Sequence, residues 1–126
     1  MLQSTLAKIE ALINQNELIN NVDSKKVSNL LNYYKKDMWI YPSVLKRKLQ
    51  VDIKTAYSIL NLLEDQDLIE RYYELYCFDC QHSTGLLKKT MNLFVAKIGF
   101  IVECDTCQRT LFALENCRVV FVVVTE

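Results

Sequence analysis

Cys77-Phe78-Asp79-Cys80 and Cys104-Asp105-Thr106-Cys107 are two copies of a Cys-x-x-Cys motif, and they determine how the C-terminal half of the chain is interpreted. Two thiolates separated by two residues can reach one ion from a single tight turn, and two such turns complete the tetrahedral sulfur shell that structural zinc prefers. The segment 81–103 between the motifs is slightly longer than the usual 15 to 20 residues, so it is expected to carry structure of its own. We therefore predict one structural Zn²⁺ ion, bound by Cys77, Cys80, Cys104 and Cys107.

Disulfide bonds, a redox pair, buried thiols and an iron site are the alternative interpretations of these cysteines. Disulfides are disfavoured because the chain has five cysteines, an odd number, and because the motifs lie in polar turns. A thioredoxin-like motif would explain one Cys-x-x-Cys and leave the other without a role. His82 is near enough to replace a ligand, although we expect it to be a solvated loop residue, and Cys117 is interpreted as an ordinary strand residue.

The length and composition of the chain limit its class. Its 126 residues can bury one modest core or two small ones, and a bound metal would stabilise the smaller one. A hydrophobic content of 51%, a charged content of 24%, two glycines and one proline are typical of a folded soluble protein. No apolar run is long enough to span a membrane, and the N-terminus lacks the pattern of a signal peptide, so we expect a cytoplasmic, reducing location.

The charge pattern and the residue inventory argue against two function classes. The formal net charge is zero, and a site with four thiolates around one divalent ion would add about two negative charges, which disfavours charge-driven nucleic-acid binding by the cysteine region. The chain has one histidine and no glycine-rich phosphate loop, and four cysteine ligands leave no open metal position for water or substrate. We therefore predict that the protein is not an enzyme.

Apolar residues that recur at steps of three and four predict helices in the first half of the chain. With their bounds, these predicted helices are Leu2–Gln15, Ser24–Lys36, Pro42–Leu49 and Ile53–Gln66. The first helix is amphipathic, with an apolar stripe made by Leu2, Leu6, Ile9 and Ile13. The last helix has a core stripe made by Ala56, Ile59, Leu60 and Leu63.

Runs of β-branched and aromatic residues predict the strands. With their bounds, these predicted strands are Met38–Tyr41, Leu68–Tyr76, Lys97–Glu103, Leu111–Leu114 and Arg118–Thr125. The last two are expected to pair with each other, and the unbroken apolar run in the last one implies burial on both faces, either within the chain or in an interface with another chain. Residues 82–85 are expected to form a turn, whereas 86–96 fits neither period and is left open.

Three motifs carry a family resemblance: PSVLKRKL at 42–49, TAYSILNLLE at 55–64 and DLIE at 67–70. Together they resemble the winged helix-turn-helix of many transcription regulators, where a short helix, a recognition helix ending in Leu-x-x-Leu-Glu and a strand opening with Gly-Leu-Ile follow one another. Asp67 stands where glycine is common, and an aspartate can adopt the left-handed conformation required there at some cost. The resemblance covers about residues 24–76.

The sequence thus predicts an α+β fold in three parts. An N-terminal amphipathic helix and linker occupy 1–23, a winged helix-turn-helix occupies 24–76, and a small antiparallel β zinc ribbon with C-terminal strands occupies 77–126. A winged helix followed directly by a four-cysteine ribbon is similar to the layout of the alpha subunit of general transcription factor E, which contacts RNA polymerase during promoter opening. That resemblance implies a partner in the transcription machinery.

The resemblance implies a DNA-binding transcription regulator or a transcription-associated factor, with helix 53–66 in the major groove. The side chains expected to contact DNA are Lys46, Arg47, Lys48, Lys54, Thr55, Tyr57, Ser58 and Asn61. The alternative is an adaptor subunit that binds proteins in a larger complex, for which a neutral chain is no disadvantage. The sequence also allows a homodimer, which would double the weak electrostatic contribution of a helix with one cation.

Overall fold

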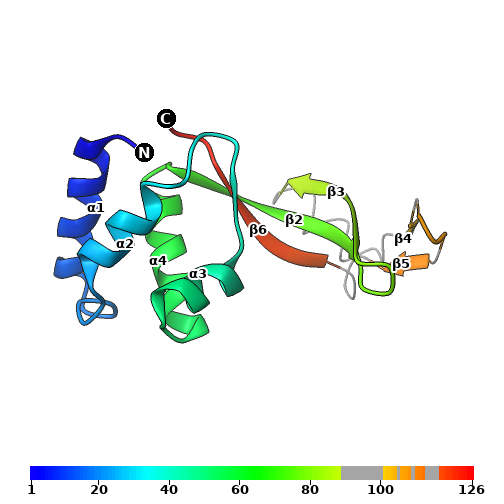
Figure 1. Ribbon diagram of the computed structural model, residues 1–126, viewed down its shortest axis with the longest axis horizontal. Helices are drawn as coiled ribbons and strands as arrows, with labels where there is room; N and C mark the ends of the chain where they lie inside the picture. Colours follow the sequence, from blue (N-terminus) through cyan, green and yellow to red (C-terminus); the bar gives the residue numbers. More distant parts are fainter. Residues whose placement is uncertain (89–100, 105, 109, 113–116) are drawn as a thin grey trace. The chain divides into compact units, whose positions relative to one another are not determined.

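The computed structural model describes residues 1–88, 101–104, 106–108, 110–112 and 117–126, and it has the predicted α+β class (Figure 1). The helices in the described residues are α1 (Gln3–Gln15), α2 (Ser24–Leu31), α3 (Pro42–Leu49) and α4 (Ile53–Asp65). The strands are β1 (Trp39–Ile40), β2 (Ile69–Cys77), β3 (His82–Lys88), β4 (Ile101–Glu103), β5 (Thr110–Phe112) and β6 (Cys117–Val123).

The chain divides into two compact units. One unit, which we call the helical unit, consists of 1–70 together with 121–126, and the other, the cysteine unit, consists of 71–120. Strands β2 and β6 each pass from one unit into the other. The predicted domain boundaries after residues 23 and 76 stay predictions.

Helix α1 buries most of its predicted apolar stripe. Leu6, Ile9 and Ile13 are buried, and α1 packs against α2. Leu2, which was predicted to belong to the stripe, is 60% exposed, so this part of the prediction was wrong. The helix begins only at Gln3, and Leu2 therefore has an extended backbone that does not follow the helical period.

Helix α2 starts as predicted and ends earlier. The Asp23 carboxylate accepts hydrogen bonds from the backbone N–H groups of Lys25 and Lys26 and caps the first turn. The helix ends at Leu31, whereas the sequence predicted an end near Lys36. Backbone bonds that span three residues, including one from Tyr34 N–H to the Leu31 carbonyl, tighten the chain after α2 and end the regular helix.

Helices α3 and α4 form a packed pair joined by a short turn. Pro42 occupies the start of α3, where its missing N–H is not needed, and Gln50 ends α3 in the left-handed conformation at φ 57°. Asp52 caps α4 by accepting the Thr55 N–H at 2.7 Å. The predicted core stripe of α4 is confirmed as buried, and it comprises Ala56, Ile59, Leu60 and Leu63.

Asp67 is left-handed at φ 60°, as expected for a residue that stands where glycine is common. It reverses the chain between α4 and β2. A backbone hydrogen bond connects the residue after this turn to the C-terminal segment: the Val124 N–H donates to the Leu68 carbonyl.

Strand β6 lies between two other strands in a four-stranded sheet with the order β1-β6-β2-β3. It pairs antiparallel with β1 through Trp39 opposite Val122 and Ile40 opposite Phe121. This central position explains the apolar run at 119–124, in which every residue is buried or half-buried.

The predicted pairing of 111–114 with 118–125 was wrong. Strand β5 instead pairs with β4, through Val102 opposite Leu111, and forms a separate two-stranded sheet. An apolar strand such as β6 gains more burial between two neighbours than at the edge of a hairpin. Residues 113–116, which the predicted connection needed, lie outside the described residues.

Residues 82–85 are part of strand β3 and not a turn, so that prediction was also wrong. Strand β3 pairs antiparallel with β2, and Cys77 lies opposite His82. The chain therefore reverses within 78–81, and the first Cys-x-x-Cys motif itself makes the hairpin loop. For the segment 86–96, which was left open, residues 86–88 belong to β3 and 89–96 lie outside the described residues. The predicted strand 97–103 is described only at 101–103, where it forms β4.

Candidate metal centre

The two Cys-x-x-Cys motifs have related backbone arrangements. Cys77 ends strand β2, and Cys80 lies in the loop before β3. Cys104 directly follows β4, and Cys107 lies in the next turn, where the Gln108 N–H donates to the Cys104 carbonyl at 2.8 Å. Each motif thus begins at the end of a strand and is followed by a turn.

The residue after each motif is a left-handed glutamine. Gln81 has φ 56°, and Gln108 has φ 61°. A positive φ at this place turns the chain sharply after the second cysteine. The signal is present in the sequence as a repeated Cys-x-x-Cys-Gln, and it was not part of the prediction.

The four sulfur atoms come together in one cluster. All lie within 4.8 Å of one another, with 3.6 Å between Cys77 and Cys107 and 3.4 Å between Cys80 and Cys104. The four cysteines are free thiols, and these distances are far above the S–S bond length of about 2.05 Å. Four sulfurs at about 2.3 Å from one zinc ion would be about 3.8 Å apart in a tetrahedron, so the cluster has the size of a metal site.

Exposure differs among the four thiols. Cys77 and Cys104 are fully buried, Cys80 is half-buried, and Cys107 is exposed. Cys77, Cys104 and Cys80 pack together as a small cluster of their own. One side of the site is therefore closed by protein, and Cys107 faces solvent.

The protein environment shifts two thiol pKa values in opposite directions. Burial, followed by hydrogen bonds with the other three thiols, raises the pKa of Cys80 to about 12. The Cys107 backbone N–H is the largest influence on Cys104 and, with the Thr106 N–H, lowers its pKa to about 6. The cluster therefore already favours one thiolate, which is the form that binds a metal.

A chain of side chains in the cysteine unit connects the first motif to β6. The Phe78 ring contacts the Tyr76 ring edge to face, with centroids 5.3 Å apart. The Arg118 guanidinium lies over the Tyr76 ring at 3.8 Å and also pairs with the Glu74 carboxylate, which is only 1% exposed. This ion pair could not be predicted from a local sequence pattern, because its partners are 44 residues apart.

The side chains of the other two cysteine-region candidates are not described. His82 is in strand β3 opposite Cys77, so the expectation that it lies in a loop was wrong. Cys117 begins β6, which agrees with the interpretation of Cys117 as a strand residue. The metal cluster among the described side chains is thus the predicted set of four cysteines.

The residues predicted to contact DNA lie on α3 and α4 and have different exposures. The exposed ones are Lys46, Arg47, Lys48, Lys54 and Asn61. The half-buried ones are Thr55, Tyr57 and Ser58. The Ser58 hydroxyl donates to the Lys54 carbonyl at 3.0 Å, within its own helix.

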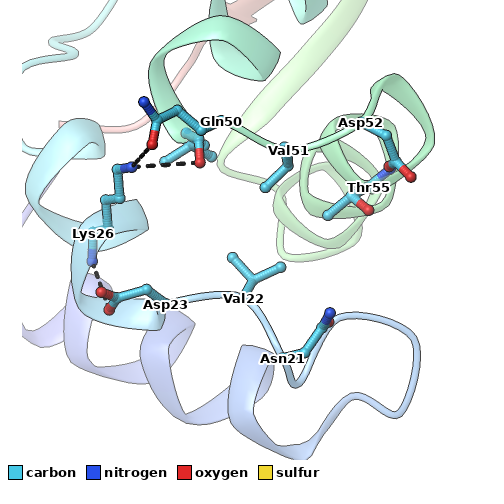
Figure 2. Close-up of a pocket in the computed structure, with 9 residues that line it drawn as sticks. Asn21, Val22, Asp23, Lys26, Gln50, Val51, Asp52 and Thr55 are labelled. Atoms are coloured by element: carbon cyan, nitrogen blue, oxygen red, sulfur yellow. Dashed lines mark hydrogen bonds between the residues drawn. The ribbon is translucent and has the colours of Figure 1, made fainter.

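A cavity of about 470 Å³ lies between the start of α2 and the α3–α4 turn (Figure 2). Lys26, which was not among the predicted site residues, lines one side of the cavity and extends from α2 to the end of α3. Its Nζ is 3.5 Å from both the Leu49 carbonyl and the Gln50 Oε1. The cavity also has Asp23 and Asp52 in its lining, so its charged groups are mixed in sign.

A smaller depression of about 170 Å³ lies beside the exposed side of α4. Asn16 and Leu18 from the connection after α1 line it together with Ser58 and Asn61. Ser58 and Asn61, which were predicted to contact DNA, therefore lie beside the segment that follows α1.

Comparisons with known proteins give no relative: no family model, no curated protein and no solved structure matches this chain. Among the helices in the described part of the chain, none has the length and apolar content needed to cross a membrane.

Proposed function

We propose that this chain is a zinc-containing winged helix-turn-helix protein that binds duplex DNA as a transcription regulator or transcription-associated factor. The observation that carries the proposal is the strand order β1-β6-β2 combined with the helix pair α3 and α4. In this interpretation the three helices of the winged helix-turn-helix are α2, α3 and α4, with α4 as the recognition helix. The strands of the wing are β2 and β6.

The proposed wing contains the cysteine region. Strands β2 and β6 are neighbours in the sheet, and both Cys-x-x-Cys motifs fall between them in the sequence. A zinc ribbon would thus be an insertion in the wing and not a separate C-terminal addition. Its four-cysteine shell would be structural, because four protein ligands leave no position for a reacting water or substrate.

Zinc is the metal that this donor set favours. Four thiolates in a tetrahedral cluster suit zinc or an iron–sulfur centre, and two Cys-x-x-Cys turns are typical of structural zinc. The bound ion would fix the ends of β2 and β4 relative to each other through Cys77 and Cys104.

The charge distribution around the α3–α4 turn supports DNA as the partner. Lys46, Arg47, Lys48 and Lys54, opposed by Asp52 alone, give residues 42–57 a net charge of +3 in a chain whose formal net charge is zero. All four cations are exposed. A local concentration of exposed cations on a helix-turn-helix is the electrostatic feature that phosphate binding requires.

Binding to a fluorescent duplex of 20 base pairs at low salt tests the proposal. The parent protein should bind, and Lys54→Ala should weaken binding and reduce the salt dependence by about one unit, because one phosphate contact is lost. Lys8→Ala is the matched control, since Lys8 is an exposed lysine on α1. Failure of the parent protein to bind duplex DNA at low salt would reject the function.

The face of β1 opposite the core favours a second candidate function, that of a protein-binding adaptor. Trp39 is 39% exposed, and the Trp39 and Tyr41 rings contact each other with centroids 6.4 Å apart. Trp39 lies opposite the half-buried Val122 in the sheet, so apolar groups continue onto β6. If this face binds a protein, Trp39→Ala should abolish co-purification of that partner while leaving zinc content unchanged.

A further inference from the structure

We infer that the DNA contact of this protein is made mainly with phosphates and depends little on base sequence. The inference rests on the proposed function and specifies its ligand as the backbone of duplex DNA. It follows from three features of the helix pair: where its cations lie, which polar groups of α4 are already engaged, and how charge changes along α4.

The exposed cations lie around one end of the helix pair. Lys46, Arg47 and Lys48 are in the last turn of α3, and Lys54 is in the first turn of α4. Lys46 and Lys54 also act on the Asp52 carboxyl group, whose pKa is lowered first by hydrogen bonding with Thr55 and then by these two charges. Because Asp52 can offset only one of the four cations, the rest are available to phosphates.

The polar side chains of α4 that could read base edges are restricted. The Ser58 hydroxyl is half-buried and donates to the Lys54 carbonyl, and Thr55 is half-buried beside the Asp52 cap. Asn61, the residue best suited to recognise adenine, lines the small depression with Asn16 and Leu18. A base contact by Asn61 would require the segment after α1 to leave room for DNA.

Charge reverses along α4. Lys54 is at its N-terminal end, whereas Glu64 and Asp65 are at its C-terminal end and Asp67 follows. At 1.5 Å per residue, about 16 Å separate Lys54 from Asp65 along the axis, so phosphates are attracted at one end and repelled at the other. The first turn is therefore the part of α4 that attracts DNA, and its polar side chains are Lys54, a cation suited to phosphates, and the half-buried Thr55.

Fluorescence titrations of the parent protein with two 20-base-pair duplexes of unrelated sequence test the inference. The two affinities should agree within about threefold, and log K should fall with log salt concentration with a slope of about −3 to −4, as expected for about four phosphate contacts. Selection from a random pool of duplexes should retain DNA without enriching a motif.

Alanine variants test which side chains form the DNA-binding surface. Arg47→Ala and Lys48→Ala should each reduce the slope by about 0.9 and weaken both duplexes equally, whereas Asn61→Ala should change neither affinity by more than about twofold. Circular dichroism and zinc content confirm that each variant is folded. An enriched motif that Asn61→Ala abolishes, or an unchanged slope in both basic variants, would overturn this inference and leave DNA binding intact. Absence of binding to every duplex would instead reject the proposed function.

Discussion

The helical unit and the cysteine unit hold their folds by different means. In the helical unit every main element places a fully buried apolar side chain in the core, as shown by Ile9, Leu31, Leu45, Leu60 and Phe121. In the cysteine unit the buried residues with described side chains are Glu74, Leu75, Cys77, Cys104 and Val120. The first unit has a hydrophobic core of its own, whereas three of the five buried residues that the structure describes in the second unit are cysteine or glutamate.

This difference shows that one short chain can combine two sources of stability. Apolar burial stabilises a unit in proportion to the area removed from water, and a small unit with little apolar area needs another source. Among the described residues of the cysteine unit, the four-cysteine cluster, which could hold a metal, and the Glu74–Arg118 pair offer such sources. The two units should therefore respond differently to the same perturbation.

Loss of the proposed zinc ion should have the largest effect and should be confined to the cysteine unit. Cys104→Ser should release about one zinc per chain and unfold this unit, because structural Zn²⁺ contributes about 10–16 kcal/mol of apparent binding free energy in zinc-finger peptides. Elemental analysis measures the zinc, and circular dichroism should show that the helical signal remains. Cys117→Ser is the control and should keep the metal; zinc loss in that variant would show that the ligand assignment is wrong.

Truncation of a core side chain in the helical unit should destabilise that unit and leave zinc binding by the cysteine unit intact. Leu60→Ala removes a fully buried side chain from α4 and should cost about 2 to 5 kcal/mol, measured by denaturant unfolding followed through the helical signal. Lys54→Ala, on the same helix but exposed, should change stability by no more than about 0.5 kcal/mol. If Leu60→Ala left the helical transition unchanged and released zinc, the division between the units would be refuted.

Removal of the ion pair should affect the cysteine unit by a smaller amount than removal of the metal. Arg118→Ala removes the ion pair with the buried Glu74 carboxylate and should cost about 1–3 kcal/mol. Hydrogen exchange should show the lost protection in β2 and β6. Adding Glu74→Gln should restore part of the stability, because a neutral amide is less costly to bury than a carboxylate that has lost the charge of Arg118. No recovery in the double variant would argue against the pair as the cause.

Acidification should produce the smallest effect, in the helical unit. Hydrogen bonding with Thr55 is the main reason that the pKa of Asp52 lies below its ordinary value of 3.8, so the folded state favours the carboxylate. The contribution of this cap is complete above the unfolded pKa and is lost as pH falls through the lower folded pKa. Melting temperatures between pH 6 and 2.5 should therefore fall less in Asp52→Asn than in the parent protein. Parallel curves would rule out Asp52 as a source of acid sensitivity.

Local patterns were sufficient for the existence of the helices, for most of their buried stripes and for the set of four clustered cysteines. The stripe of Ala56, Ile59, Leu60 and Leu63 identifies the buried side of α4, because side chains three and four residues apart share one face. The pair of Cys-x-x-Cys motifs likewise identified the four clustered thiols, since a tight turn brings the two sulfurs of each motif together. Both signals are complete within a few neighbouring residues.

The sequence by itself therefore determined the class of the fold, the cores of the helices and the set of four cysteines. Only the tertiary structure decided that β6 lies between β1 and β2, that His82–Lys88 is a strand, and that Arg118 pairs with Glu74. These features join residues far apart in the chain, such as Ile40 and Phe121. An apolar strand carries no local signal of its partners, because hydrophobic burial is non-directional and only the competition among all strands selects the pairing.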